Sequence, residues 1–299
     1  MKRVALATCA ALPDLDPDER LVIEPLRGLG VEAAAAVWDD PTVDWAAFDL
    51  VVIRSTWDYT ERRDAFVAWA RSVPRLANPA DIVEWNTDKH YLADLAAAGV
   101  PVVPTDWIEP GTAVDLPAAG VHVLKPAIGA GSVDAARFSL HDEHEAQLAR
   151  EHAARLGAAG RTVMVQPYLD LIDERGETAL IYLGGVFSHA VTKGAMLAAE
   201  RALVEGLYKE ETITPRTPSA AELDIARAAL AAVPGGGERL VYARVDLVPD
   251  VNGSPVLIEL ELTEPSLFLG SAPRSVEQFA KRLASVLAQG HRIKHQVGK

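Results

Sequence analysis

Two apolar segments near the C-terminus, 242–248 and 255–262, are interrupted by charged residues at alternate positions. Because side chains alternate between the two faces of a strand, Arg244 and Asp246 share one face of the first segment. Glu259 and Glu261 share one face of the second in the same way. The residues between the segments read Pro-Asp-Val-Asn-Gly and predict a turn. We therefore expect a hairpin that brings the four charged side chains onto one face of an antiparallel sheet.

Three carboxylates on one sheet face offer the oxygen ligands that a hard cation such as Mg2+ prefers. The alternative is a hydrated sheet face on which the charges have no ligand. Burial of unpaired charge is costly, so a buried version of this face needs cations close by. Asp246, Glu259 and Glu261 are accordingly candidate metal ligands.

Composition limits the class of protein. The chain has 299 residues, 42 acidic against 29 basic side chains and a formal net charge of -13. This length predicts two or three packed subdomains, and the acidic balance argues against nucleic acid or an anionic membrane as partner. The single cysteine, Cys9, fits a reducing compartment, and no apolar run reaches the roughly 20 residues of a membrane helix. We expect a cytoplasmic protein whose oligomeric state, a homo-oligomer included, the sequence leaves open.

The N-terminal part alternates between strand and helix patterns, which predicts an α/β domain with a parallel sheet. The expected elements are strands at 2–8, 31–38 and 50–53 and a helix at 18–30. The third strand runs into a polar and aromatic loop at 54–59, and ligands of open α/β sheets gather at the carboxyl ends of strands. Arg54 and Ser55 are therefore candidate substrate contacts. The alternative is an ordinary loop that Ser55 or Asp58 caps.

The remainder predicts a long helix, a proline-rich linker, a small α+β module and a C-terminal sheet. The expected elements are helices at 81–99, 141–156, 219–232 and 276–289, strands at 121–125, 137–140, 162–167, 178–183 and 186–193, and the charged hairpin.

A lysine and a glycine-rich loop follow one another at 125–132. Lys125 ends a predicted strand, and Gly129, Gly131 and Ser132 follow in a loop whose backbone N–H groups can approach an anion such as a nucleotide phosphate. The loop lacks the pattern of a P-loop and is followed by a strand, unlike a dinucleotide fingerprint. Taken alone, the segment favours a plain hairpin turn.

The order of five separated elements resembles the ATP-grasp superfamily. These are Lys89 in a helix, the Lys125 loop, the segment Val-Gln-Pro-Tyr-Leu at 165–169, an acid in a hinge, and the charged hairpin. The resemblance covers about 86–277 and implies a fold of mixed α/β and α+β class. It comprises an N-terminal parallel-sheet domain (1–80), a central helix and linker (81–118), a mobile ATP lid (119–168) and a C-terminal antiparallel-sheet subdomain (169–299).

The resemblance also implies ATP and Mg2+ as cofactors, with two ions and Mn2+ as a substitute. Asp246, Glu259 and Glu261 would hold the metal, and Arg244 would contact the transferring phosphoryl group. Lys193 ends a predicted strand and precedes Gly194, a place that suits contact with a phosphate or acyl-phosphate better than a surface role. The nucleotide would be bound by residues of the lid, helix and hinge: Lys89, Lys125, Gly129, Gly131, Ser132, Gln166, Pro167, Tyr168, Leu169 and Glu177. Asp173 and Glu174 compete with Glu177 for the ribose, and we favour Glu177. Glu261 departs from the superfamily, which commonly has Asn at this position.

Within the superfamily, the segments at 54–59, 166–168, 188–193 and 258–266 most resemble the O-ureido-D-serine cyclo-ligases of D-cycloserine biosynthesis. The implied activity is that of an ADP-forming ligase acting on a small amino acid. ATP would activate the carboxylate as an acyl-phosphate, and a nitrogen of the same molecule would then attack it. Glu264 or Ser266 would contact the substrate's amino group, and Arg54 its carboxylate. The alternatives are an intermolecular carboxylate–amine ligase and a noncatalytic nucleotide-binding module.

Overall fold

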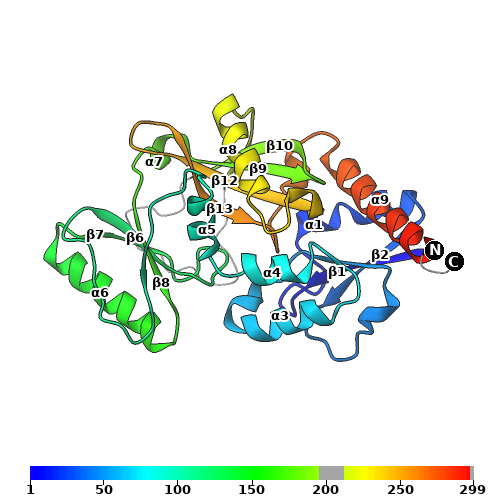
Figure 1. The fold of residues 1–299 in the computed structure, drawn as a ribbon, viewed down its shortest axis with the longest axis horizontal. Helices are drawn as coiled ribbons and strands as arrows, with labels where there is room; N and C mark the ends of the chain where they lie inside the picture. The colour runs from blue at the N-terminus through cyan, green and yellow to red at the C-terminus, as the bar shows by residue number, and fades with distance from the viewer. Residues whose placement is uncertain (195–211, 297–299) are drawn as a thin grey trace.

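The computed structural model describes residues 1–194 and 212–296 and contains three sheets (Figure 1). The first is parallel, as the N-terminal pattern predicts, and its strand order is β2-β1-β3-β4. Its strands are β1 (Lys2–Thr8), β2 (Val31–Val37), β3 (Leu50–Ile53) and β4 (Leu76–Ala77), and the helical segments beside it are α1 (Pro17–Arg20), α2 (Ile23–Gly28), η1 (Trp45–Ala47), η2 (Trp57–Glu61) and α3 (Arg63–Ser72).

The single helix predicted at 18–30 is wrong, because the structure has the two short helices α1 and α2 there. Pro25 explains the break, since proline lacks the backbone N–H of a helix interior and its ring collides with the carbonyl four residues earlier. Because α2 begins at Ile23, Pro25 lies within its first turn, where no such hydrogen bond is needed.

The helix predicted at 81–99 is likewise divided into α4 (Ala80–Asn86) and α5 (Tyr91–Ala97). Between them, the backbone N–H of Lys89 donates to the carbonyl of Ala127 at 3.0 Å instead of to a carbonyl of its own helix. This contact ties the interhelical turn to the start of the glycine-rich loop. The break therefore places Lys89 beside that loop.

The second sheet is antiparallel, with order β5-β8-β6-β7. Its elements are β5 (Asp106–Ile108), β6 (Val121–Pro126), β7 (Ala136–Ser139), β8 (Val163–Pro167) and the helix α6 (Glu143–Ala158). Leu124, Phe138 and Leu156 belong to the apolar core between the sheet and α6. The strand β5 lies inside 81–118, which we expected to be helix and linker. The lid sheet therefore begins earlier than the predicted boundary at 119.

The third sheet is antiparallel, with order β11-β10-β9-β12-β13. Its strands are β9 (Glu177–Leu183), β10 (Val186–Lys193), β11 (Ile213–Arg216), β12 (Tyr242–Pro249) and β13 (Pro255–Glu261), and the accompanying helical segments are α7 (Ile172–Arg175), α8 (Ala220–Ala231), η3 (Gly237–Arg239), η4 (Leu269–Ser271) and α9 (Ser275–Gln296). The predicted hairpin is confirmed as β12–β13, with Arg244 opposite Glu261 and Asp246 opposite Glu259.

The C-terminal helix α9 contacts α2 of the N-terminal domain, and the N-terminus lies near the end of α9 (Figure 1). Leu26, Tyr242 and Phe279 belong to one apolar core, so the first and third sheets are packed together while the lid projects from them. In the described part of the chain no helix is both long and apolar enough to span a bilayer.

Candidate active site

A cavity lies between the lid sheet and the third sheet and is lined by β6, the loop after it, β8, β9, β10 and β13. The structure brings together in its wall most of the residues that we predicted for nucleotide, metal or substrate. These are Lys89, Lys125, Gly129, Gly131, Ser132, Gln166, Pro167, Tyr168, Leu169, Glu177, Lys193, Glu259, Glu261 and Glu264.

Arg244, Asp246 and Ser266 are not lining residues, but they are bound to the wall. Arg244 Nη2 lies 2.5 Å from Glu261 Oε1 and 2.8 Å from Asp246 Oδ2. Its Nη1 donates to the carbonyl of Ser266 at 3.2 Å. Asp246 is 0 % exposed, so this charge is tolerated only because cations surround it.

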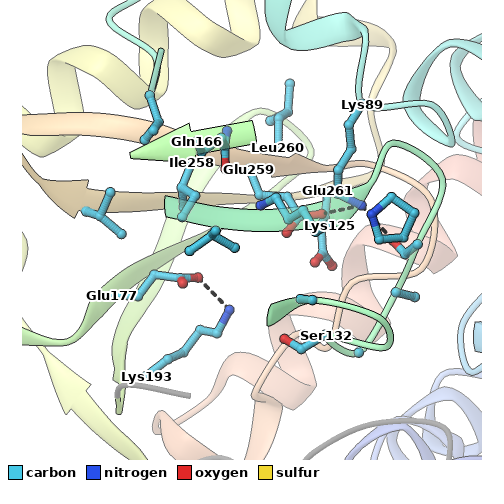
Figure 2. Close-up of a pocket in the computed structure, with 18 of the residues that line it drawn as sticks. Lys89, Lys125, Ser132, Gln166, Glu177, Lys193, Ile258, Glu259, Leu260 and Glu261 are labelled. Carbon is cyan, nitrogen blue, oxygen red and sulfur yellow. Dashed lines mark hydrogen bonds and ion pairs between the residues drawn. The ribbon is translucent and has the colours of Figure 1, made fainter. Parts of the chain in front are cut away.

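Two lysines complete the ion-pair network (Figure 2). Lys193 Nζ lies 2.5 Å from Glu177 Oε1 and 3.2 Å from Asp246 Oδ2, so it joins β9 to β12. Lys89 Nζ lies 3.1 Å from Glu259 Oε1 and 2.6 Å from the carbonyl of Gly129. Lys89 therefore connects the second strand of the hairpin with the glycine-rich loop of the lid.

The neighbouring charges lower the pKa of two hairpin acids, whereas the pKa of the third is raised. Burial disfavours the ionised form of Asp246, but Arg244 and Lys193 outweigh this and lower its pKa to about 2. Burial likewise opposes ionisation of Glu259, and Lys89 and Lys125 outweigh it, so the pKa is lowered. For Glu261, burial and the nearby acids prevail over Arg244 and raise the pKa to about 8.

The carboxylates of Asp246, Glu259 and Glu261 fit a divalent cation, because one oxygen of each lies within 4.8 Å of the others. Lys125 fits an anion in the same cavity. Among the described residues it makes no side-chain hydrogen bond or ion pair, and burial lowers the pKa of its ammonium group. A phosphate group near Lys125 would stabilise its charged form.

The predicted adenine segment lies at the hinge side of the cavity. The side-chain amide of Gln166 donates to Thr105 Oγ1 at 2.9 Å, and the backbone N–H of Tyr168 donates to the carbonyl of Val121 at 2.8 Å. The Tyr168 hydroxyl donates to Asp173, and Arg137 lies 3.6 Å from the Tyr168 ring centroid. Of the three acids considered for the ribose, Glu177 lines the cavity, whereas Asp173 and Glu174 do not.

The predicted substrate contacts Arg54 and Ser55 are wrong, because both side chains are 0 % exposed and neither lines the cavity. Arg54 Nε lies 2.8 Å from Glu19 Oε2, and its guanidinium lies over the ring of Tyr242 at 4.6 Å from the centroid. The Ser55 hydroxyl accepts a hydrogen bond from the backbone N–H of Asp16 at 3.1 Å. Arg54 thus packs the N-terminal domain against the third sheet, and Ser55 holds a loop within the N-terminal domain.

Several cavity residues were missed in the sequence. Tyr59 belongs to the same 54–59 loop and lines the cavity in place of Arg54, so the loop was identified and the residue was not. Asn86 and Tyr91 come from α4 and α5, and Ile258 precedes the metal-ligand candidate Glu259 on β13. The only signal for Asn86 was its place at the start of the ATP-grasp resemblance.

Asn86 fixes the hairpin strand that carries two candidate metal ligands. Its Nδ2 donates to the carbonyl of Leu260 at 2.7 Å, and its Oδ1 accepts from the backbone N–H of Leu262 at 2.7 Å. The Tyr91 hydroxyl accepts from the backbone N–H of Leu260 at 3.0 Å. These side chains saturate the outer edge of β13, which would otherwise expose unpaired backbone groups.

Comparison of the sequence with known proteins points to one family. Residues 4–78 match the family model described as the N-terminal domain of the D-cycloserine synthetase DcsG. The chain is 40% identical over 302 residues to the cycloserine biosynthesis protein DcsG of Streptomyces lavendulae, with 95% of this chain and 98% of the relative covered.

A solved structure from the same family is also similar to this chain. The crystal structure of the D-cycloserine synthetase DcsG matches with a TM-score of 0.85 and 38% identity, covering 95% of this chain and 99% of that one. The D-alanine–D-alanine ligase from Bacillus anthracis complexed with ATP matches with a TM-score of 0.65 and 14% identity over 100% of both chains. A RimK domain ATP-grasp protein from Sphaerobacter thermophilus matches with a TM-score of 0.64 and 18% identity, covering 94% and 99%. The last two similarities concern the fold alone.

Proposed function

The chain belongs to the family of the cycloserine biosynthesis protein DcsG, within the ATP-grasp ligases, and we propose that it closes the ring of D-cycloserine from O-ureido-D-serine. It is an ATP-dependent ligase, and the proposal concerns its substrate, its residues and the ring-closing step. The observation that carries it is the carboxylate cluster of Asp246, Glu259 and Glu261 in a cavity that also contains Lys125.

We propose that Asp246, Glu259 and Glu261 bind two Mg2+ ions, for which Mn2+ can substitute. Carboxylate oxygens suit both ions, and Glu261 retains an oxygen ligand where the superfamily commonly has Asn. Bound metal supplies charge compensation for the phosphates. Arg244 and Lys193 already contact this cluster, so they are placed to stabilise the charge of a phosphoryl group in transfer.

We assign the nucleotide to the lid side of the cavity. Lys89 and Lys125 bind the phosphates together with the backbone of Gly129, Gly131 and Ser132, whose loop is positioned through Lys89. The segment Gln166, Pro167, Tyr168 and Leu169 receives the adenine, and Glu177 binds the ribose. Glu264 and Ser266 are assigned to the substrate side.

In the proposed reaction, a carboxylate oxygen of O-ureido-D-serine attacks the γ-phosphorus of ATP, and ADP leaves. The ureido nitrogen bonded to oxygen then attacks the carbonyl carbon and gives up its proton, and phosphate leaves with the bonding electron pair. This closes the five-membered ring, from which water later removes the carbamoyl group as carbamic acid. Both reacting groups belong to one molecule, so the enzyme gains in effective concentration and needs no second amine site.

The test is ADP release with O-ureido-D-serine, its L-enantiomer and other small carboxylic acids, each with and without added amines, together with product mass. We expect ADP and a cyclic product from O-ureido-D-serine without an added amine. Turnover that requires a separate amine would identify an intermolecular ligase instead. ATP binding with no ADP release from any acid would identify a noncatalytic module and refute the proposal.

A further inference from the structure

The loop that follows β3 holds one segment of the cavity wall through three side chains. Arg54 Nη2 donates to the carbonyl of Pro265, and Trp57 Nε1 donates to the carbonyl of Glu264 at 3.1 Å. The hydroxyl of Tyr59 lies near the carboxylate of Glu264 and interacts with it. A loop of the N-terminal domain therefore sets both the backbone and the side chain of Glu264, which belongs to the third-sheet part of the chain.

Glu264 differs from the other acids of the cavity. It is 8 % exposed and lines the cavity, but it is not a member of the three-carboxylate cluster. Within the described residues, no lysine or arginine forms an ion pair with it. The partner of its side chain is the neutral hydroxyl of Tyr59, which is 3 % exposed. A carboxylate can accept several hydrogen bonds, so Glu264 retains capacity for a cationic donor in the cavity.

Two cations near Glu264 are already engaged elsewhere, and the third, Lys125, forms no ion pair with it among the described residues. Lys89 contacts Glu259 and the carbonyl of Gly129, and Arg244 contacts Asp246 and Glu261. One carboxylate beside one tyrosine offers too few oxygen ligands for a divalent ion. A primary ammonium group has three hydrogen-bond donors and a single positive charge, so it suits the place beside Glu264 and Tyr59 better than a divalent ion does.

We propose that Glu264 is the subsite for the protonated α-amino group of the substrate, and that Tyr59 is its positioning residue. The inference rests on the proposed carboxylate activation and narrows the substrate class to acids with an ammonium group. Glu264 selects these acids by pairing with that group. Arg54 and Trp57 act indirectly, because they hydrogen-bond to the backbone carbonyls of Pro265 and Glu264 and so fix the backbone there.

The test compares binding of amino acids with their desamino analogues. The pairs are O-ureido-D-serine with 3-(ureidooxy)propanoate and D-serine with 3-hydroxypropanoate, measured by calorimetry with a nonhydrolysable ATP analogue and Mg2+. We expect the wild-type enzyme to bind the amino member of a pair roughly 100-fold more tightly, as for hydrogen bonds between charged groups. Glu264→Gln is expected to lose most of this preference, and Tyr59→Phe to reduce it roughly 10-fold.

If Glu264 had a merely structural role, its replacement would weaken the binding of both ligands of a pair equally. The ratio of the two affinities is therefore the deciding readout. Glu277→Gln, which changes an exposed glutamate in the same way, is the matched control and should keep the wild-type ratio. The affinity for the ATP analogue should stay within about twofold in Tyr59→Phe, because the nucleotide side is unaffected.

The inference is overturned if Glu264→Gln keeps the wild-type ratio, or if the wild-type enzyme binds both members of every pair equally or neither. Binding does not require turnover. A selective wild-type enzyme that nevertheless releases no ADP with O-ureido-D-serine would refute the proposed ring closure and support the ammonium subsite.

Discussion

Replacement of Asn86 by Ala removes a side chain that pairs with two buried backbone groups, the carbonyl of Leu260 in β13 and the N–H of Leu262 just after it. A buried polar group left without a partner costs about 1–3 kcal/mol. Two such groups give a loss of about 3 kcal/mol in unfolding free energy, in the lower half of the summed range, since Asn86 lines the cavity and water can take its place there. Asn86→Asp keeps the acceptor for Leu262 but puts a buried carboxylate oxygen against the carbonyl of Leu260, so we expect a loss at least as large.

Urea denaturation of the variants measures these differences, with Asn252→Ala as the control. Asn252 is an exposed residue of the β12–β13 turn, so its replacement should change stability by less than about 0.5 kcal/mol. Leu260 and Leu262 flank Glu261, so Asn86→Ala should also raise the Mg2+ concentration needed for half-maximal ADP release. Equal stability losses in Asn86→Ala and Asn252→Ala would refute the reasoning.

Three further results are expected. Asp246→Asn should reduce ADP release by roughly 100-fold or more, while the exposed Asp224→Asn should not change it. Mg2+ and ATP at about 100 times the dissociation constant should stabilise the protein by about 2.7 kcal/mol, and Lys125→Ala, unlike the exposed Lys281→Ala, should reduce the resulting rise in Tm. Burial, opposed by Tyr59 and Lys89, raises the pKa of Glu264 from 4.5 to about 7. The folded state thus keeps a proton that the unfolded chain releases, and stability should fall by about 3 kcal/mol as the pH rises through this window. In urea titrations Glu264→Gln should show a shallower fall, and an unchanged slope would refute this assignment.

The parts of the fold that follow local rules were predictable. Alternation of charged and apolar residues with a turn between them predicted β12 and β13, and the structure confirms the pairing of Asp246 with Glu259. Apolar runs likewise predicted β1, β2 and β3 of the parallel sheet, although not the two-residue strand β4. The ATP-grasp fold inferred from the order of the motifs is confirmed by the solved structures.

Contacts between distant segments were not predictable from the same rules. Arg54 directly follows a strand end, where ligand contacts are common, yet Glu19, Tyr242 and Phe279 surround it. None of these residues is near it in sequence, so nothing local shows that its charge is already paired. Tyr59 is a similar case, because its role depends on Glu264, which is reached only when the first and third sheets pack together.

The cavity face of β13 depends on an irregularity that no periodicity predicts. Opposite Asp246 lies Glu259, but opposite Leu247 lies Leu257, so Ile258 is an extra residue in β13. Strict alternation from Glu259 would place Leu257 on the charged face and Ile258 on the other. The bulge instead places Leu257, at 0 % exposure, in the apolar core, and Ile258 lines the cavity beside Glu259. Bulges redirect side chains in this way, often next to active sites. An apolar surface and a metal-ligand candidate thus become neighbours in one wall, as a site that binds both a base and its phosphates requires.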